Sequence, residues 1–364
     1  MKYLSEYRDP KLARKFLDEI KSSVTQNWSI MEVCGGQTHS LVKNGIIEML
    51  PKEVTMVHGP GCPVCVTPLR LIDKAIHLAL HEKVILCSFG DMLRVPGSEK
   101  NLLEAKAQGG DIRVLYSPIE AVKIAEENPD KEVVFFAVGF ETTAPANALS
   151  VIHAHRKKLK NYSILSSHVL VPPAIKAVME DKESNIDGFL AAGHVCTIMG
   201  NQEYYPLATH YNVPIVVTGF EPLDVLQGIL MVIRQLEQNK AHVENQYSRI
   251  VREDGNLKAQ EMIYEVFKIQ NQIWRGIGEI SDSGYAIKDK YSHYDATKKF
   301  VIDIEEAPEN PDCISGQIMK GIKKPFECPQ FGKKCKPTNP LGAPMVSSEG
   351  ACAAYYHFSG LIEV

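Results

Sequence analysis

Short apolar runs alternate with helical patterns over the first 240 residues of the chain. Eight of these runs read as strands, over residues 29–33, 54–58, 84–89, 112–116, 133–138, 163–166, 188–192 and 215–218. They are continuously apolar and rich in β-branched or aromatic residues, as strands buried on both faces are. The gaps between them are long enough for crossover helices, so the pattern predicts parallel βαβ units.

Helix-start signals support this interpretation. Asp9-Pro10 precedes apolar residues at helical spacing and predicts an N-terminal helix over 8–24. Thr67-Pro68 offers an N-cap and a first-turn proline ahead of an apolar helix face that begins at Ile72.

The eight strands fall into two groups of four, with a break near residues 127–131. We therefore predict two Rossmann-like α/β domains, over residues 25–128 and 129–238. Residues 243–252 and 257–274 then look helical, and the chain after Asp282 has weak periodicity. We predict a third domain over residues 239–364, mainly helical and irregular, packed with the N-terminal helix.

Composition narrows the class of protein. The chain has 364 residues, 45% hydrophobic and 23% charged, which suits a globular protein of two or three domains. A net charge of −4 gives no basic field for nucleic acid or an anionic membrane. No apolar run is long enough to cross a bilayer, and the first six residues lack the apolar stretch of a signal peptide. We expect a cytoplasmic protein.

The number of cysteines is unusual for this class. Structural disulfides are rare in a reducing cytosol, yet the chain has nine cysteines. We therefore expect several of them to be metal ligands or redox thiols.

One pair, Cys62 and Cys65, forms a CxxC motif between a predicted strand and a predicted helix. The positive end of a helix favours the thiolate, which is both a nucleophile and a metal ligand. Gly59-Pro60-Gly61 already supplies the turn, so the two cysteines are not needed to fill it. A redox pair and half of a metal site both remain open.

Cys34 ends the preceding strand, directly before Gly35 and Gly36. A lone cysteine at a strand end is usually a core residue, but neighbouring parallel strands end at one sheet edge, where ligands collect. We therefore expect Cys34 to converge with the CxxC thiols, with His39 and His58 nearby.

Four further cysteines, Cys313, Cys328, Cys335 and Cys352, lie in the weakly patterned tail. Four thiols suit zinc or an iron–sulfur cluster. Structural zinc sites usually contain paired CxxC motifs, which this tail lacks, and proline follows Cys328 as it follows a ligand in bacterial ferredoxins. The tail therefore favours a four-iron cluster over zinc, and four unrelated core cysteines fit so irregular a segment poorly.

The remaining candidates are weaker. Cys87 lies inside an apolar strand and is interpreted as core, whereas Cys196 is either core or site-lining. Acids and threonines at strand-end turns could bind a ligand, but N-capping explains them equally well; they are Glu141, Thr142, Thr143 and Glu221. No P-loop, GxGxxG, HExxH or CxxxCxxC pattern is present. Walker-type nucleotide hydrolysis, standard dinucleotide binding, zinc proteolysis and radical-SAM chemistry therefore lack their usual sequence signatures.

Four sequence blocks resemble the HypD family of hydrogenase maturation factors. They are EVCGGQTH at 32–39, GPGCPVCVTP at 59–68, GFETTAP at 139–145 and MVSSEGACAAYY at 345–356. The blocks run in the family's order across nearly the whole chain, and no cysteine-bearing motif departs from the family pattern.

The resemblance implies two α/β domains, a cluster domain and a scaffold for assembling the Fe(CN)₂CO group of [NiFe]-hydrogenases. The implied partners are HypC, which holds the iron jointly, HypE, which donates cyanide, and the hydrogenase large subunit, reached through HypC. The implied cofactors are a [4Fe-4S] cluster and a transient Fe(II) that carries cyanide and carbon monoxide. The four tail cysteines match the cluster positions, and iron handling and thiol redox fall to Cys34, Cys62 and Cys65. We add His39 to these three as a catalytic candidate.

The resemblance favours a redox-active assembly scaffold over a free-standing turnover enzyme. Two other functions remain open: a cluster-linked thiol–disulfide reductase, and an iron chaperone whose cluster is purely structural. A reductase needs the CxxC pair to cycle but does not need Cys34. A chaperone needs the thiols but no redox change at the cluster.

Overall fold

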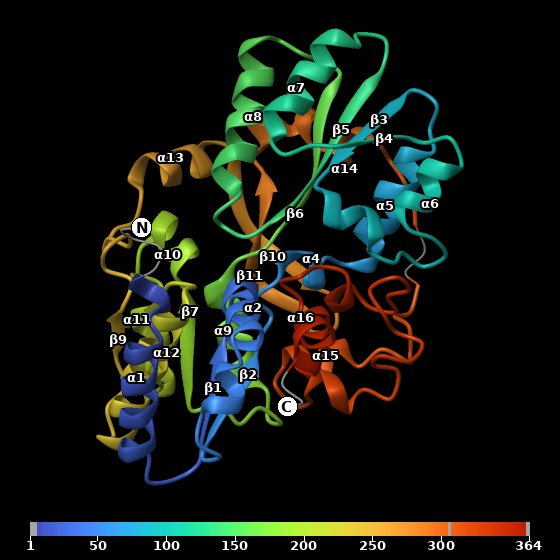
Figure 1. The fold of residues 1–364 in the computed structure, drawn as a ribbon. Coiled ribbons are helices and arrows are strands. Elements are labelled where there is room, and N and C mark those ends of the chain that lie inside the picture. The colour runs from blue at the N-terminus through green and yellow to red at the C-terminus, as the bar shows by residue number, and fades with distance from the viewer. Residues whose placement is uncertain (1–5, 305–306, 362–364) are drawn as a thin grey trace.

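The computed structural model describes residues 6–304 and 307–361, which contain two parallel sheets and one hairpin (Figure 1). Sheet A has the order β2-β1-β7-β8-β9, with β1 (Trp28–Glu32), β2 (Val54–His58), β7 (Gly188–Ala192), β8 (Ile215–Thr218) and β9 (Val243–Asn245). Sheet B has the order β4-β3-β5-β6, with β3 (Val84–Ser88), β4 (Asp111–Val114), β5 (Glu132–Gly139) and β6 (Tyr162–His168). The predicted α/β class with two parallel sheets is therefore confirmed.

The predicted grouping of the strands is wrong. All eight predicted strands form, but the chain leaves sheet A after β2, builds the whole of sheet B, and returns to sheet A at β7. Ile30 of β1 pairs with Gly188 of β7. The predicted boundary between residues 128 and 129 places these two neighbouring strands in different domains. Apolar runs mark where strands lie, whereas the pairing is decided by packing between distant segments, which no local pattern records.

Helices cover both faces of each sheet, as parallel strands require. The helices associated with sheet A are α1 (Pro10–Ser23), α2 (Gly35–Lys43), α3 (Ile46–Met49), α9 (Val171–Glu180), α10 (Gly193–Met199), α11 (Tyr204–Tyr211) and α12 (Pro222–Glu237), with the 3₁₀ turn η1 (Glu6–Arg8). Those associated with sheet B are α5 (Leu69–Ala79), α6 (Leu102–Ala107), α7 (Pro118–Glu127) and α8 (Ala144–Arg156), with η2 (Gly90–Arg94). No helix in the described residues is long and apolar enough to cross a membrane.

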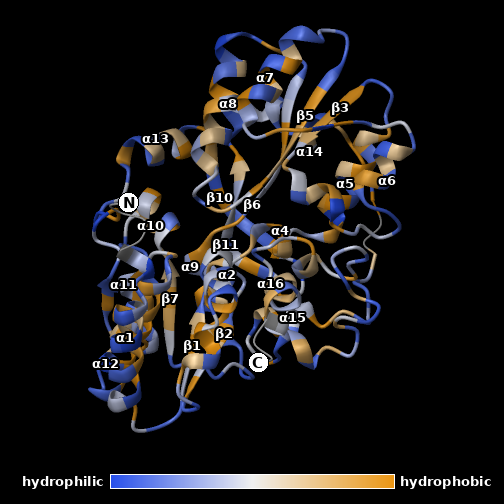
Figure 2. Cartoon of the chain, viewed as in Figure 1, coloured by the Kyte–Doolittle hydropathy of each residue, from blue (hydrophilic) through white to orange (hydrophobic). Residues whose placement is uncertain are grey.

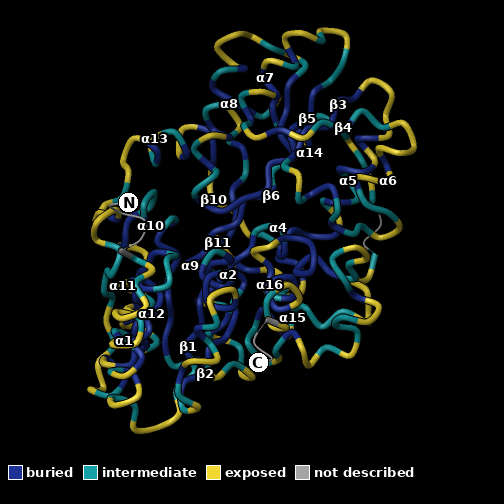
Figure 3. Tube along the Cα trace, in the orientation of Figure 1, coloured by how far each residue is buried: buried dark blue, intermediate teal, exposed yellow. Residues whose placement is uncertain are grey.

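The core lies between the sheets and these helices. The strands are mostly hydrophobic in Figure 2 and buried in Figure 3, whereas the outer helices alternate between buried and exposed faces. Strand β5 illustrates the pattern, because every residue from Val133 to Gly139 is buried. Such a strand gains roughly 25 cal/mol for each Å² of apolar surface that it removes from water.

The N-terminal helix forms where the sequence predicts it. The Asp9 carboxylate accepts a hydrogen bond from the backbone N–H of Lys11 at 2.8 Å, and Pro10 occupies the first turn. Its predicted packing is wrong, however. Leu17 and Ile20 pack against α12, because they share a buried apolar cluster with side chains of that helix such as Leu226 and Ile229.

Residues 239–300 do not form part of a separate third domain. Strand β9 completes sheet A, and β10 (Phe267–Trp274) and β11 (Gly278–Ile287) form a separate two-stranded hairpin. The hairpin packs against the core of sheet B, together with α13 (Leu257–Val266), η3 (Asp289–Tyr294) and α14 (Ala296–Lys299). The helices predicted over 243–252 and 257–274 are therefore wrong in part, since only 257–266 is helical. Phe267 stacks on Tyr285 of β11 with ring centroids 5.7 Å apart, a contact across the hairpin that competes with the helical pattern.

The C-terminal segment consists of short helices and loops, as predicted. They are α15 (Ser315–Met319), η4 (Pro325–Glu327), η5 (Ala343–Met345), α16 (Ala351–Phe358) and η6 (Ser359–Leu361). Figure 1 shows this segment in red beside α2 and α4 (Pro63–Val66), the two helices that follow β1 and β2. Helix α16 packs on α2, and η5 packs on α4.

Candidate functional site

Cys34 stands where β1 ends and α2 begins. Its backbone N–H donates to Oε2 of Glu32 at 2.9 Å, and the N–H of Gly35 donates to the carbonyl of Gly61 at 2.8 Å. A Cβ atom on Gly61 would lie 2.2 Å from the backbone nitrogen of Cys34. Only glycine therefore lets the loop after β2 approach the end of β1 this closely.

The Cys34 thiol is buried beside an imidazole. Its Sγ atom lies 3.6 Å from Nδ1 of His194, the second residue of α10. Burial raises the pKa of Cys34, and the nearby carboxylates of Glu32 and Glu349 raise it further, whereas backbone N–H groups at the start of α2 lower it. Burial also lowers the pKa of His194 to about 4, so the imidazole is neutral at pH 7 and can accept a hydrogen bond from the thiol.

Glu32 and His58 form a buried pair behind Cys34. Nδ1 of His58 lies 2.7 Å from Oε1 of Glu32, and Nε2 of His58 lies 2.9 Å from the hydroxyl of Tyr355 in α16. Thr38 also donates to Oε1 of Glu32. Both ring nitrogens of His58 are therefore engaged with protein groups, and His58 lies near Cys34, as expected, through its contact with Glu32.

Cys62 and Cys65 are joined by a disulfide, with their Cα atoms 5.2 Å apart. Cys62 caps α4, and both residues are buried in the same apolar cluster as Cys34. The CxxC motif thus lies between a strand and a helix, as predicted. The three cysteines gather at one edge because β1 and β2 are adjacent and end in register, with Glu32 opposite His58.

His39 faces the C-terminal segment. Its Nδ1 lies 3.3 Å from the carbonyl oxygen of Ser348, and its ring meets Phe358 edge to face at 5.1 Å. These contacts give His39 a role in docking that segment onto α2, and the catalytic role expected for it stays a prediction.

The four tail cysteines line one cavity. Its other walls are mostly apolar, and the lining includes Cys313, Cys328, Cys335, Cys352, Ile318, Phe331, Leu341 and Met345. Burial raises the pKa of Cys352, and the other three thiols raise it further, which reflects how closely the four approach one another. The backbone N–H of Leu341 donates to the sulfur of Cys335 at 3.4 Å. The structure therefore brings together the four cysteines that the sequence grouped.

The four thiols form one donor set. Within the two described ranges, no group of three or more His, Cys, Asp or Glu side chains has the geometry to hold a single metal ion. In a [4Fe-4S] cluster each thiolate binds a different iron, so the ligands surround a cavity. Four cysteines around one mostly apolar cavity are therefore residues that can fit such a cluster.

One short segment touches both the disulfide turn and the cavity. Ala343 and Val346 pack in a buried cluster that Val64 of the CxxC turn contacts, and Pro344 and Met345 line the cavity. Helix α4 packs directly on η5. The redox-capable pair and the four-thiol cavity are therefore separated by residues 343–346.

The other candidates bind protein groups. Cys87 is buried in the core of sheet B, as expected, and Cys196 lies in the core cluster of sheet A. Oε1 of Glu141 accepts from the N–H of Val171 at 2.9 Å, and burial raises the pKa of Glu141 to about 8. Thr143 and Glu221 occupy N-cap positions but make no side-chain cap bond; Glu221 instead pairs with Arg8 at 2.6 Å.

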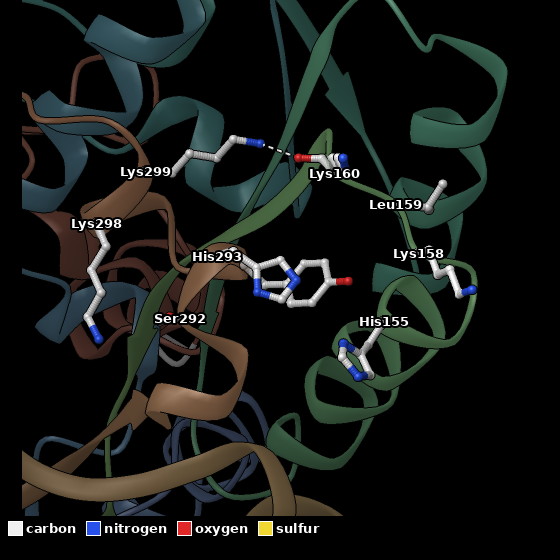
Figure 4. Close-up of a pocket in the computed structure, with 9 residues that line it drawn as sticks. His155, Lys158, Leu159, Lys160, Ser292, His293, Lys298 and Lys299 are labelled. Atoms are coloured by element: carbon white, nitrogen blue, oxygen red, sulfur yellow. Dashed lines mark hydrogen bonds between the residues drawn. The ribbon is translucent and has the colours of Figure 1, made fainter.

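A separate cavity lies between α8 and η3 in the sheet B half (Figure 4). It has a volume of about 680 Å³ and is lined by His155, Lys158, Leu159, Lys160, Ser292, His293, Tyr294, Lys298 and Lys299. Two of its four ammonium groups are already neutralised, because Lys298 pairs with Asp289 and Lys299 with Glu132. The residues that line this cavity include no cysteine, so we place the candidate functional site in the thiol region instead.

Three site residues escaped the sequence analysis. His194 approaches Cys34 because β7 pairs with β1, Glu349 packs against Gly35, and Tyr355 bonds to His58. The only local signal was that His194 follows a strand-end glycine; linking it to Cys34 requires the strand order.

Known proteins match the chain over nearly its whole length. The sequence model described as "HypD: Hydrogenase formation hypA family" matches residues 11–359. The chain is 46% identical to the hydrogenase maturation factor HypD2 of Bradyrhizobium diazoefficiens, over 98% of this chain and 97% of that protein. It is 45% identical to HypD of Azotobacter vinelandii with the same coverage, and 41% identical to HypD of Escherichia coli over 98% of both chains. The chain therefore belongs to the HypD family of hydrogenase maturation factors.

Proposed function

We propose that this protein is the scaffold on which the Fe(CN)₂CO group of a [NiFe]-hydrogenase is assembled. Cys34 holds the iron jointly with a cysteine of HypC, HypE donates cyanide, and the hydrogenase large subunit receives the product through HypC. The thiol chemistry requires a reducing compartment, so we place this work in the cytoplasm.

One observation carries the proposal. The free thiol of Cys34 shares a buried cluster with the Cys62–Cys65 pair, and the segment 343–346 lies between that pair and the four-cysteine cavity. A simple binding protein would need only the first of these three groups. The presence of all three groups supports an iron site at Cys34, a redox pair at Cys62–Cys65 and an electron source at the four-cysteine cavity.

In this proposal, Cys313, Cys328, Cys335 and Cys352 hold a [4Fe-4S] cluster. Such a cluster, when bound, supplies single electrons at low potential. The apolar walls of the cavity limit access of water, and the Leu341 N–H stabilises the Cys335 sulfur as thiolate.

Iron binding at Cys34 requires loss of the thiol proton, because the thiolate is the ligand. Iron binding itself releases that proton, Nδ1 of His194 lies within hydrogen-bonding reach of the sulfur, and the N–H groups at the start of α2 stabilise the thiolate. A soft thiolate suits Fe(II) that carries cyanide and carbon monoxide. The Cys62–Cys65 disulfide takes up two electrons and two protons to give two thiols, and this dithiol stores two reducing equivalents beside that site.

An infrared spectrum tests this proposal. The protein is purified anaerobically together with HypC and HypE, and the cyanide and carbonyl stretches are recorded. Cys34→Ala should abolish those bands and hydrogenase maturation. Cys87→Ala is the matched control, since Cys87 is equally buried but lies in sheet B, and it should keep both.

The two rival functions give different results. Normal bands and maturation in Cys34→Ala would favour a thiol–disulfide reductase. Bands that persist when Cys62 and Cys65 are both replaced by alanine would favour an iron chaperone with a structural cluster.

A further inference from the structure

We propose that Tyr355 is a positioning residue for Cys34 and acts on it through His58 and Glu32. The inference rests on the proposed function only in taking Cys34 as the important thiol. Its basis is a continuous chain of hydrogen bonds that crosses from the C-terminal helix α16 to the end of β1.

The chain has three links. The Tyr355 hydroxyl lies 2.9 Å from Nε2 of His58, Nδ1 of His58 lies 2.7 Å from Oε1 of Glu32, and Oε2 of Glu32 accepts the Cys34 N–H at 2.9 Å. An ionised Glu32 carboxylate only accepts, so Nδ1–H of His58 donates to it, and the Tyr355 hydroxyl is the hydrogen-bond partner of Nε2.

Every member of the chain is removed from water. The exposed fraction is 0% for Glu32, 4% for His58, 5% for Tyr355 and 1% for Cys34. A buried polar group that loses its partner costs its full desolvation energy, and such networks hold one arrangement when fully satisfied. The Tyr355 hydroxyl is the partner that holds Nε2 of His58, and so fixes the ring that fixes Glu32.

Packing and hydrogen bonding can be separated at Tyr355. Its ring meets the His58 ring edge to face, with centroids 5.2 Å apart, and phenylalanine would keep that contact. Only the hydroxyl joins the hydrogen-bond chain. Tyr355→Phe therefore removes the chain's first link while it leaves the helix packed.

The hydrogen-bond chain connects Cys34 to the helix that carries Cys352. Tyr355 lies three residues after Cys352, on the same helix, and α16 packs on α2. How α16 docks, and hence the condition of the four-thiol cavity, is thereby transmitted to the backbone of Cys34. The iron-binding thiol is held in place only when the C-terminal segment is in position.

Hydrogen–deuterium exchange of the full-length, anaerobic protein tests the inference. In Tyr355→Phe the Cys34 amide should exchange roughly ten- to hundredfold faster, the loss expected for a weakened bond to a charged acceptor. The amides of Leu86 and Phe135, in the centre of sheet B, should exchange at the wild-type rate. Tyr356→Phe is the matched control: this neighbour lies on the same helix but is exposed, and its ring contacts Phe331. It should change nothing at Cys34.

A second pair of variants excludes a merely structural effect. His58→Phe keeps an aromatic ring but removes both ring nitrogens, so it breaks the same hydrogen-bond chain at its middle link and should accelerate Cys34 exchange at least to the same degree. Adding Tyr355→Phe to it should then have no further effect, because residues of one network are not additive. If Tyr355→Phe fails to fold, His58→Phe alone decides the question.

Unchanged Cys34 exchange in Tyr355→Phe, or equal acceleration in Tyr356→Phe, would overturn the inference. Neither result depends on iron or hydrogenase. Conversely, faster exchange together with normal maturation in Cys34→Ala would leave the positioning role intact and reject the proposed function.

Discussion

The Sγ atom of Cys34 lies 3.6 Å from Nδ1 of His194, although the two residues are 160 positions apart in the chain. Strand β1 ends two residues before Cys34, the N-cap of α2, and strand β7 ends directly before α10, which carries His194. The pairing of these two strands, continued by the N–H of Val33 donating to the carbonyl of Leu190, sets the thiol against the imidazole. The sheet edge that carries Cys34 is thus built from two parts of sheet A, β1–β2 and β7–β9. In the sequence, all four strands of sheet B lie between these two parts.

Close backbone packing at this edge predicts that Gly61→Ala is strongly destabilising. The new Cβ would meet the backbone of Val33 and Cys34 at 2.2–2.5 Å, so β1 or the CxxC loop must move. We expect the free energy of unfolding to fall by about 2 kcal/mol or more, as overpacked sites do. Urea titration measures this.

Gly90→Ala is the control, because its Cβ would meet only a Val114 methyl at an ordinary 3.6 Å. It should leave the urea midpoint within experimental error. A similar loss in both variants would show that the packing of Gly61 is not the cause.

The tail cavity predicts a cluster with a defined composition. Anaerobically purified protein should be brown, with about four iron and four sulfide per chain. Cys352→Ala should lose most of both, whereas Cys196→Ala, which alters an equally buried cysteine outside the cavity, should keep them. Iron and labile-sulfide assays decide, and stoichiometric zinc without sulfide would contradict the assignment.

The Cys62–Cys65 disulfide is predicted to be reversible. Its position at the start of α4 favours the thiolate of Cys62, which receives the N–H of Cys65 at 3.2 Å. Differential alkylation should find the pair blocked in air and modified after low-potential reduction. Free thiols that persist under mild oxidant would exclude the electron-storing role and leave only a ligand role.

Features that depend on neighbouring residues can be predicted from the sequence, whereas features that depend on contacts between distant segments cannot. The strand at 54–58 was predicted to the residue, because a continuous apolar run is a local signal. The segment after Val266 was predicted as helix because its pattern fits both periods, and the Phe267–Tyr285 contact that decides it comes from across a hairpin. The same holds for the site. The thiols follow from strand ends and spacing, whereas His194 and Tyr355 depend on strand order and on the docking of a distant helix.

Acid stability is predicted to depend on His168. Its Nε2 accepts a hydrogen bond from the Asn147 amide at 3.0 Å, and burial lowers the pKa of His168 from 6.5 to about 4. Because the folded pKa is depressed, the unfolded chain takes up the proton first. The stabilisation from the neutral ring is therefore complete above pH 6.5 and is lost progressively toward pH 4, by roughly 3 kcal/mol in all.

The test is His168→Gln, whose side-chain oxygen can accept from Asn147 and does not titrate. Urea unfolding of this variant over about three pH units, from about pH 7.5 down to about pH 4.5, should give a flatter stability curve than the wild type, because this range covers most of the interval between the two pKa values of His168, 6.5 and about 4. Some acid loss should remain, because burial also lowers the pKa of His194 to about 4. His210→Gln alters an exposed ring at the end of α11 and should keep the wild-type slope. Equal slopes in wild type and His168→Gln would show that protonation of His168 does not limit stability in acid, and that the Asn147 contact adapts to a charged ring.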